Sequence, residues 1–586
     1  GWQARAHRPE LPSPPPSPQP PSRTMPIPFT GKCDFVYDPQ GNTPCRDLLL
    51  PATEEEANEV VSLEWPAGFR FGAATSAYQV EGGIIDTNWN RWEDMRVREG
   101  DGKETVRPNA DGSVGAGKAT DMWNLFESVD LPIIKQLGLS TFRFSVEWSR
   151  VQPKRDVFDQ AAVDRYARWC RLLRAEGIEP MVTLLHFTEP GWFEDLGGWE
   201  SPQAAEAFGE FARYLAPRLA PHCCLWCTLN EPVGCALNGW LQGIHPPGKQ
   251  GQVRTVFTVL YNQLMAHKQA ADAIMAAESR ETPTVLIATN VLWFESDPER
   301  SLKLGLLSFV AWAANILINY AMMDALVFGR LPNFPLPLDT TAWLCGARPG
   351  LRSLKGSVNA CGVNNYVRVW FRLQLLALLS WLNPYSKQVE RTKSGGLRVR
   401  KDHRLEEAEA AEVISGEQAI GGGVLQGDPH DPRFEMSDMG WDLCPSTLGV
   451  VIDGFWRRYQ LPILVTESGT ADGDVHDKRR VRYLSGCLRA VHQAVGRGCD
   501  VRSYMYWSYQ DNFEWAEGYR PRFGLCRVDF ATLERKPTGG FKLYQQVIAR
   551  HRVRQGASEA AGAPVQRRRA TSPAKPRKPG KAGKAA

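Results

Sequence analysis

Two glutamates in this chain stand where carboxyl groups could carry out acid–base chemistry. Glu231 follows the apolar, strand-like run 223–229, and Glu467 follows the similar run 462–465. Hydrolysis of a glycosidic bond needs a pair of carboxyl groups, one acting as acid and the other as nucleophile or base. Either glutamate taken alone is explained equally well as a solvated loop residue. The pair becomes informative when the fold brings both to one place.

The elements that must position these residues are strands, and eight apolar runs have the required length and composition. Amphipathic, helix-like stretches such as 163–176, 204–219 and 478–496 lie between the runs. Alternating strands and helices call for parallel strands, and eight of them indicate a closed barrel. We therefore predict an α/β fold, a single-domain (β/α)8 TIM barrel, with both glutamates at the carboxyl ends of its strands. The eight runs are 71–75, 141–148, 180–186, 223–230, 284–289, 360–366, 462–467 and 501–507.

The barrel is predicted to occupy residues 61–551 of the 586-residue chain. Residues 1–60 form a Pro-rich N-terminal extension, which we expect to be largely irregular. An insertion at about 373–434 follows the sixth strand, and we expect its polar part to be mobile. Residues 552–586 form a basic tail with little apolar surface to bury, so we predict that it is disordered.

The net charge is unevenly distributed along the chain. From Arg550 onward, eleven Lys or Arg residues and one acid, Glu559, give the tail +10, so the whole-chain charge of +4 leaves −6 for the body. An acidic body argues against nucleic-acid binding as the main function. A solvated tail is a simpler explanation of the basic residues than contact with a membrane or a nucleic acid.

The thirteen cysteines indicate a reducing compartment, such as the cytoplasm. They are odd in number, lack the spacing of a disulfide framework, and often lie in apolar runs, so we expect reduced, buried thiols. Cys223, Cys224 and Cys227 resemble a metal cluster, but alternate strand residues face opposite sides, and we interpret them as core residues. The sequence starts without an initiator Met or an apolar signal segment, so targeting to an organelle stays open.

Two apolar segments depart from the strand–helix pattern. The segment 302–331 contains a strongly apolar stretch that Asn315 and Asn319 interrupt, which makes it too short for a membrane-spanning helix. A buried barrel helix is the simpler interpretation, and an interfacial helix is the alternative. The run 373–382 in the insertion could cover the barrel mouth, contact a membrane or meet a partner. Peripheral membrane contact through either segment is a hypothesis.

Five motifs in combination resemble glycoside hydrolase family 1, the β-glucosidase family, from about Trp65 to His551. They are FRFGAATSAYQVEG at 69–82, FRFSVEWSR at 142–150, NEP at 230–232, WSYQDNFEW at 507–515 and RFGL at 522–525. The resemblance implies a retaining enzyme whose two carboxyl groups lie roughly 5 Å apart. It also implies that no cofactor or metal is required, because the carboxylates supply the chemistry.

By this resemblance, Glu231 is the general acid/base and Glu467 is the nucleophile. The acid/base must be protonated to assist the leaving oxygen and then ionised to activate water. Arg143 in the second strand could keep Glu467 ionised, with a purely structural ion pair as the alternative. Tyr366 matches the family tyrosine that donates a hydrogen bond to the nucleophile, and Asn364 keeps the asparagine of the same motif.

The resemblance also implies a sugar pocket lined by side chains that bind hydroxyl groups. Amide and carboxylate groups offer the paired donors or acceptors that neighbouring hydroxyls bridge. Trp507 would form an aromatic floor for the C–H face of the ring. Taken alone, Trp507 and His186 would more simply be core residues. The predicted substrate-binding residues are Gln79, His186, Asn230, Asn364, Trp507, Glu514, Trp515 and Phe523.

Several positions depart from the family pattern or exclude a subfamily. Asn365 stands where a tyrosine is commoner, Ser468 where an asparagine usually follows the nucleophile, and residues 186–190 read HFTEP in place of the commoner His-Trp form. Glu231 argues against a thioglucosidase, which carries glutamine there. Glu514 and the missing phosphate-binding lysine argue against a phosphorylated sugar.

We therefore predict a retaining β-glycosidase that hydrolyses terminal non-reducing β-D-glucosyl residues of small β-glycosides, with tolerance for galactosyl or fucosyl residues. The first alternative is a transglycosylase that uses a glycolipid or alcohol acceptor at the same site. The second is a catalytically silent glycan-binding barrel, which the presence of both glutamates disfavours. Oligomeric state and the aglycone are left open.

Overall fold

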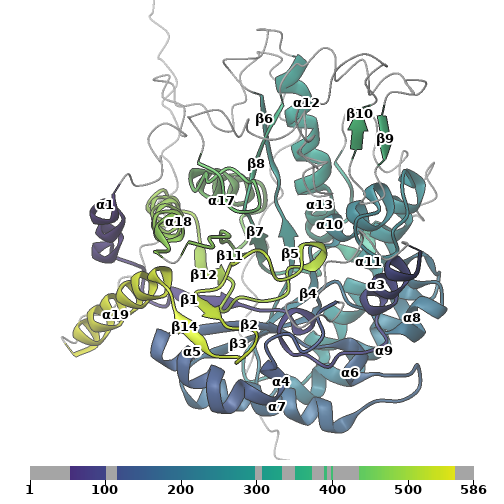
Figure 1. Cartoon of the computed structure of the whole chain (residues 1–586), viewed down its shortest axis with the longest axis horizontal. Helices are drawn as coiled ribbons and strands as arrows, with labels where there is room; N and C mark the ends of the chain where they lie inside the picture. Colours follow the sequence, from purple (N-terminus) through teal and green to yellow (C-terminus); the bar gives the residue numbers. More distant parts are fainter. Residues whose placement is uncertain are drawn as a thin grey trace, which may run out of the picture.

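The structure, a computed structural model, describes residues 53–99, 115–296, 306–332, 350–371, 389–391, 397–399, 435–474 and 476–560. Eight parallel strands close into a barrel that helices surround (Figure 1). Each strand overlaps one of the eight predicted runs, so the (β/α)8 fold is confirmed. In barrel order the strands are β1 (Arg70–Ala74), β12 (Val501–Trp507), β11 (Ile463–Glu467), β7 (Cys361–Asn364), β5 (Thr284–Asn290), β4 (Leu225–Asn230), β3 (Glu179–Leu185) and β2 (Thr141–Ser145).

The barrel strands are buried on both faces, which explains why the sequence shows continuous apolar runs instead of alternation. The ring closes where β1 pairs with β12, with Phe71 opposite Tyr504. One apolar cluster of the core contains Cys227, which therefore packs as a core residue. The cluster comprises Met181, Leu225, Cys227, Leu286, Ala288, Ala360, Leu464 and Met505.

The outer helices bury one face against the strands. Helices α9 (Ala204–Leu219) and α18 (Lys478–Gly496) have the predicted bounds. Helix α7 (Gln160–Ala175) begins earlier than predicted, because the side chain of Asp159 accepts hydrogen bonds from two backbone amides of its first turn. The surrounding helices also include α5 (Leu131–Leu137), α11 (Val253–Ala276), α13 (Ala321–Phe328), α17 (Ser446–Tyr459) and α19 (Gly539–Ala560).

The helical structure extends beyond both boundaries that we drew for the barrel domain. Residues 53–60, which we assigned to an irregular extension, enter α1 (Glu54–Asn58) and the short helix η1 (Glu59–Ser62). Ala57 is fully buried, and the hydroxyl of Ser485 donates to its carbonyl oxygen at 2.8 Å. Helix α19 continues past residue 551 to Ala560. Residues 1–52 and 561–586 lie outside the described part of the chain.

A two-stranded ribbon extends the barrel strands β5 and β7. Strands β6 (Trp293–Ser296) and β8 (Arg368–Phe371) follow them in sequence and pair in parallel. The apolar segment 302–331 forms α12 (Leu306–Ala314), the π-helical segment η5 (Asn315–Tyr320) and α13. In Figure 1, α12 stands beside the labels of β6 and β8. The insertion contributes β9 (Val389–Arg391) and β10 (Leu397–Val399), which pair in antiparallel fashion.

The asparagines that interrupt the apolar segment bind the backbone of β6 and of the residue before it. Asn319 accepts from the amide of Leu292 at 3.1 Å and donates to its carbonyl oxygen at 2.8 Å. Asn315 makes the same pair of bonds with Phe294, at 3.1 and 2.8 Å. The asparagines thus attach this helix to the ribbon.

One stretch of the described chain, Val310–Phe328, has the length and apolar composition of a membrane-crossing helix, and 56% of it is buried in the protein. Core helices of soluble proteins have the same properties, and the two asparagines hold this stretch against β6. The structure therefore supports a barrel-covering helix. Membrane contact through 302–331 stays a prediction, and the run 373–382 lies outside the described residues.

Candidate active site

The carboxyl ends of the barrel strands bring predicted site residues together at one end of the barrel. Six of them are between 0 and 4% exposed. Burying a polar group is costly unless it is hydrogen-bonded. Arg143 lies on β2, His186 directly after β3, Asn230 at the end of β4, Asn364 at the end of β7, Glu467 at the end of β11 and Trp507 at the end of β12.

Glu467 has hydrogen-bond donors on both carboxylate oxygens. Nη1 of Arg143 pairs with Oε1, and the hydroxyl of Tyr366 donates to Oε2 at 2.6 Å. The Arg143 guanidinium is fully buried and also donates to Thr183 Oγ1 at 3.0 Å and to Asn230 Oδ1 at 2.7 Å. A buried ion pair is tolerated when its remaining polar atoms are bonded in this way. The arrangement fixes the position of the Glu467 carboxyl group.

Glu231 occupies the turn between β4 and α10 (Pro232–Ala236), where its φ of 46° lies in the left-handed region. Its backbone amide donates to the carbonyl oxygen of Ala288 at 2.8 Å. The side-chain amide of Asn364 donates to its Oε1 at 2.8 Å. Left-handed backbone is uncommon for residues other than glycine and clusters at functional sites. Here the turn brings the half-buried carboxyl group to Asn364.

A chain of hydrogen bonds links the two glutamates. Asn364 donates to Glu231 and, at 3.1 Å, to Oδ1 of Asn230. The same Oδ1 accepts from Arg143, which pairs with Glu467. Displacing either carboxyl group would therefore disturb bonds that hold the other.

The same network fixes the tautomer of His186. Because Oδ1 of Asn230 accepts from Arg143 and Asn364, the NH2 group of Asn230 faces Nε2 of His186 at 3.2 Å. Burial and the nearby Arg143 lower the pKa of His186 well below its ordinary value of 6.5, so the ring is neutral. Nε2 then acts as the acceptor, and the proton lies on Nδ1. The assignment follows from the hydrogen-bond network.

Gln79 is oriented by four hydrogen bonds. Its Nε2 donates to the Phe513 carbonyl oxygen at 2.7 Å, to Asn512 Oδ1 at 3.1 Å and to Glu514 Oε2 at 3.5 Å. Its Oε1 accepts from the hydroxyl of Ser76 at 2.6 Å. Gln79, at the first βα connection, thus contacts the segment that follows β12, including the predicted binding residue Glu514.

Aromatic rings form one wall next to these polar groups. The rings of His186 and Trp507 are stacked at 5.6 Å with 18° between their planes. His186 and Trp515 are stacked at 6.1 Å and 15°, and Tyr78 stacks on Trp515 at 6.0 Å and 3°. The planes of these rings are nearly parallel, as in the offset-stacked pairs that aromatic side chains form.

Trp507 depends on a glycine for its position. A Cβ atom on Gly469 would lie 1.8 Å from the carbonyl oxygen of Trp507. Only a residue without a side chain allows this close approach between the segments that follow β11 and end β12. Gly469 therefore belongs to the structure of the site, although it carries no reactive group.

Several site residues were not found from the sequence. Trp441 lies 5.8 Å from the ring of Tyr366 and 6.1 Å from that of Phe523, and it comes from a loop instead of a strand end. Asn512 binds Gln79, and Thr466 donates to Oδ1 of Asn364 at 2.6 Å. A tryptophan in a polar, glycine-containing stretch was the available signal for Trp441, whereas Asn512 and Thr466 follow only from the three-dimensional contacts.

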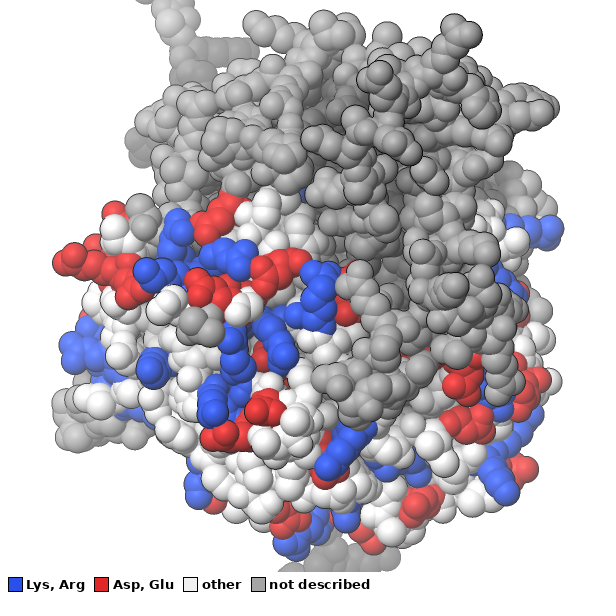
Figure 2. Space-filling view, in the orientation of Figure 1, with Lys and Arg blue, Asp and Glu red and all other residues white. Residues whose placement is uncertain are grey.

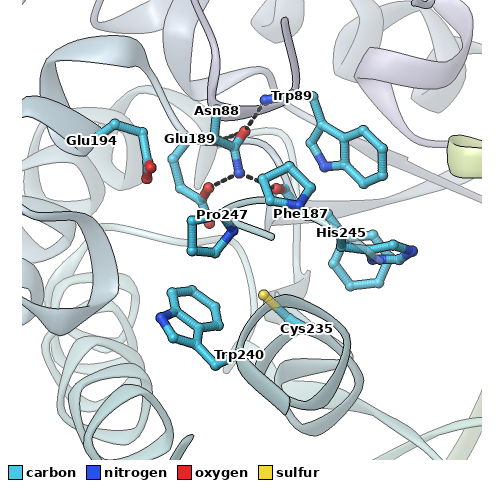
Figure 3. A pocket seen from close by; sticks show the side chains of 10 residues that line it. Asn88, Trp89, Phe187, Glu189, Glu194, Cys235, Trp240, His245 and Pro247 are labelled. Atoms are coloured by element: carbon cyan, nitrogen blue, oxygen red, sulfur yellow. Dashed lines mark hydrogen bonds between the residues drawn. The ribbon is translucent and has the colours of Figure 1, made fainter. Parts of the chain in front are cut away.

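A small cavity adjoins the aromatic wall, beside Phe187 and Trp89 (Figure 3). Its volume of about 10 Å³ suits about one water molecule. Asn88 donates to Glu189 and, at 3.0 Å, to the carbonyl oxygen of Phe187. These bonds hold the loop after His186. The cavity is lined by Asn88, Trp89, Phe187, Glu189, Glu194, Cys235, Trp240, His245, Pro246 and Pro247.

Two carboxyl groups line this cavity with raised pKa values. Burial, and then the neighbouring charge of Glu194, raises the pKa of Glu189 well above its ordinary value. Burial raises the pKa of Glu194 from 4.5 to about 7. Glu189 also accepts a hydrogen bond from Trp199 at 2.6 Å. Near neutral pH the pair therefore carries less negative charge than two ordinary glutamates.

The chain is similar to known proteins over most of its length. The family described as "Glycosyl hydrolase family 1" matches residues 61–553. Beta-glucosidase A of Acetivibrio thermocellus is 28% identical over 504 residues, which cover 83% of this chain and 98% of that protein. Beta-glucosidase A of Thermotoga maritima is 27% identical over 497 residues, covering 83% and 98%. The structure of a Thermotoga maritima beta-glucosidase in complex with azafagomine superposes with a TM-score of 0.67 at 24% identity, covering 83% of this chain and 99% of that one, which shows a shared fold.

Proposed function

The chain belongs to glycosyl hydrolase family 1, and from that premise we propose that it removes terminal β-D-glucosyl residues from small β-glycosides with retention of configuration. It is a glycoside hydrolase acting on O-glycosyl bonds. Beyond this activity, we propose which sugar is removed, that its configuration is retained, and which residues act as nucleophile and acid/base. The observation that carries it is the pair of donors on Glu467, one from Arg143 and one from Tyr366, at the same mouth that holds Glu231.

In the proposed first step, Glu467 attacks the anomeric carbon while Glu231 gives its proton to the glycosidic oxygen. The C–O bond to the aglycone breaks, the aglycone leaves as an alcohol, and a glycosyl ester forms on Glu467. In the second step, ionised Glu231 takes a proton from water, and the oxygen of that water displaces Glu467 from the anomeric carbon. The two steps return both glutamates to their starting states.

The surroundings of the two glutamates support this division of roles. Glu467 contacts the guanidinium of Arg143, and a carboxylate that must attack carbon has to be ionised at the start. Glu231 accepts from the neutral amide of Asn364 at 2.8 Å. Different environments around paired carboxyl groups are how such enzymes separate a nucleophile from a proton donor.

The hydroxyl-binding groups support a glucosyl preference. Gln79 and Glu514 lie within hydrogen-bonding distance of each other and offer a bidentate surface to neighbouring hydroxyls. The relatives matched above carry the name beta-glucosidase. Galactosyl and fucosyl residues differ from glucosyl at the same edge of the ring, so we propose that they are accepted more weakly.

The charge distribution supports a small-molecule substrate. On the face in Figure 2, acidic and basic side chains of the described residues are interspersed instead of gathered into one basic surface. Nucleic-acid binding would favour a continuous basic patch. We also propose a reducing compartment, because the ten cysteines in the described residues are free thiols.

The test is hydrolysis of a panel of p-nitrophenyl β-glycosides by the full chain. We expect nitrophenol release with the glucoside as the best substrate, and loss of nearly all activity in Glu467→Gln. Glu176→Gln, a change at an exposed glutamate, is the matched control and should leave the rate unchanged.

A second arm tests Glu231 separately. In Glu231→Ala, a dinitrophenyl glucoside should still form the glycosyl-enzyme, since its leaving group needs little protonation, and added azide should speed turnover and give a β-glucosyl azide. Absence of wild-type turnover on every sugar would overturn the proposed hydrolysis. Turnover only with an added alcohol acceptor would indicate a transglycosylase, and sugar binding without turnover a silent barrel.

A further inference from the structure

The pairing of the strands changes register beside the proposed nucleophile. Asn290 lies opposite Asn364 at the end of the β5–β7 pair, and Trp293 lies opposite Arg368 at the start of the β6–β8 pair. The first strand crosses this interval with residues 291–292 and the second with residues 365–367. The second strand therefore contains one extra residue, which is a β-bulge.

The bulge decides which way Tyr366 points. Leu292 and Phe294 pack on α12 together with Val367 and Val369. If the β5–β7 register continued unchanged, Leu292 would lie opposite Tyr366, because strand partners share a face of the sheet. Tyr366 would then join the row that faces α12. Because of the extra residue, Tyr366 does not lie in that row. Its hydroxyl instead donates a hydrogen bond to the carboxylate of Glu467.

Asn365 holds the bulge by bonding across it. Its Nδ2 donates to the carbonyl oxygen of Val291 at 2.9 Å and to that of Val367 at 3.4 Å. Its backbone amide donates to the carbonyl oxygen of Glu467 at 3.1 Å. The side chain is 2% exposed. The side-chain amide thus replaces ladder bonds that the bulge removes, and together with the backbone amide it joins three strand ends.

We propose that Asn365 is a positioning residue for the nucleophile, acting through Tyr366; this rests on the proposed function. Asn365 touches neither proposed catalytic side chain, but it stands between Asn364, which bonds Glu231, and Tyr366, which bonds Glu467. Loss of its amide lets the bulge relax and moves the tyrosine hydroxyl away from Glu467. The reaction then loses a donor on the nucleophile without losing a sugar contact.

Asn359 provides a matched control at the other end of the same strand pair. Its Nδ2 donates to the carbonyl oxygen of Pro283 at 2.8 Å, and its Oδ1 accepts from the amide of Val285 at 2.8 Å. It therefore also bridges the segments leading into β7 and β5 through a side-chain amide, at the end of the barrel away from the glutamates. Asn359→Ala tests what loss of such a bridge does when the site is distant.

The experiment measures kcat and KM on p-nitrophenyl β-glucoside per folded enzyme. Asn365→Ala should lower kcat by tenfold or more without raising KM, whereas Asn359→Ala should keep kcat within twofold. In a Tyr366→Phe background, Asn365→Ala should lower kcat by less than threefold. The hydrogen bond from Tyr366 to Glu467, through which Asn365 acts, is already absent in that background. A loss of full size in that background, or an equal loss in Asn359→Ala, would overturn the proposal.

Two further measurements keep the test decisive. If Asn365→Ala does not fold, Asn365→Thr, which has a similar volume and suits a strand, should show the same loss and the same dependence on Tyr366. A crystal structure of the folded variant should place the tyrosine hydroxyl beyond hydrogen-bonding distance of Glu467. This structural result holds even if the wild type fails to hydrolyse glucosides, so it separates failure of the positioning role from failure of the proposed function.

Discussion

The hydroxyl of Tyr366 should matter most in the second half of the reaction. Its oxygen lies 2.6 Å from Oε2 of Glu467, while Arg143 binds the other oxygen. Burial, and then the charge of Glu467, raises the pKa of Tyr366 well above 10, so the hydroxyl keeps its proton at any working pH. In the proposed mechanism, Glu467 loses charge when the glycosyl ester forms and regains it when the ester is hydrolysed. A donor on this oxygen therefore favours hydrolysis of the intermediate.

The size of the effect follows from the one bond that Tyr366→Phe removes. A hydrogen bond to a charged group contributes about 1.5–3 kcal/mol, and each 1.36 kcal/mol changes a rate about tenfold. We expect hydrolysis of the intermediate to slow by about 10- to 150-fold. With a dinitrophenyl glucoside, the variant should show a burst of product, a lower KM and a glycosyl-enzyme detectable by mass spectrometry.

The control for this change is Tyr214→Phe. Tyr214 donates to Gln160 at 2.7 Å in an exposed pair, so its hydroxyl should be dispensable for turnover. The reasoning is refuted if Tyr366→Phe keeps kcat within twofold, if it raises KM at unchanged kcat, or if its activity loss only follows a loss of folded protein in thermal unfolding.

Three other changes test the surrounding structure. Asn319→Ala leaves both backbone groups of Leu292 without their bonds and should lower the free energy of unfolding by about 2–4 kcal/mol; a change below about 0.5 kcal/mol in denaturant titration would contradict this. The folded state keeps the Glu194 proton up to about pH 7, while the unfolded chain releases it near pH 4.5. The free energy of unfolding should therefore decrease as the pH rises from about 4.5 to about 7. Glu194→Gln should therefore reduce the stability difference between pH 5 and pH 8, and an unchanged difference in denaturant unfolding would argue against it. Gly469→Ala should lower the free energy of unfolding by about 1–3 kcal/mol, because the added Cβ clashes with Trp507, and it should lower kcat/KM on the glucoside. A variant with the Tm and kcat/KM of the wild type would show that there is no such clash.

The barrel and its two glutamates could be predicted from the sequence because each depends on local pattern. Parallel strands buried on both faces need unbroken apolar runs; Glu231 comes directly after one such strand, and Glu467 ends another. The ends of the domain were less predictable. Helices α1 and α19 extend past the boundaries that composition suggested, because burial of Ala57 against α18 and continuation of a helical turn leave little trace in composition.

The parts that could not be predicted depend on contacts between distant segments. The bulge at residues 365–367 is a difference between two registers, and neither strand shows it alone. Trp441 reaches the site from a loop whose course no periodicity describes. Asn315 looked like an interruption of an apolar helix, but it bonds the backbone of Phe294. In each case the role of the residue depends on a partner that is distant in the sequence.

The asparagines of η5 also bear on how the chain avoids association with its own copies. Strand β6 pairs with β8 along one side, and its other side would present unpaired amides and carbonyls on which a strand of another molecule could form a ladder. Asn319 and Asn315 occupy these groups at Leu292 and Phe294. The helix thus covers the ribbon edge as a neighbouring strand would, and at Leu292 and Phe294 the backbone groups that an added strand would bind are already bonded to side chains.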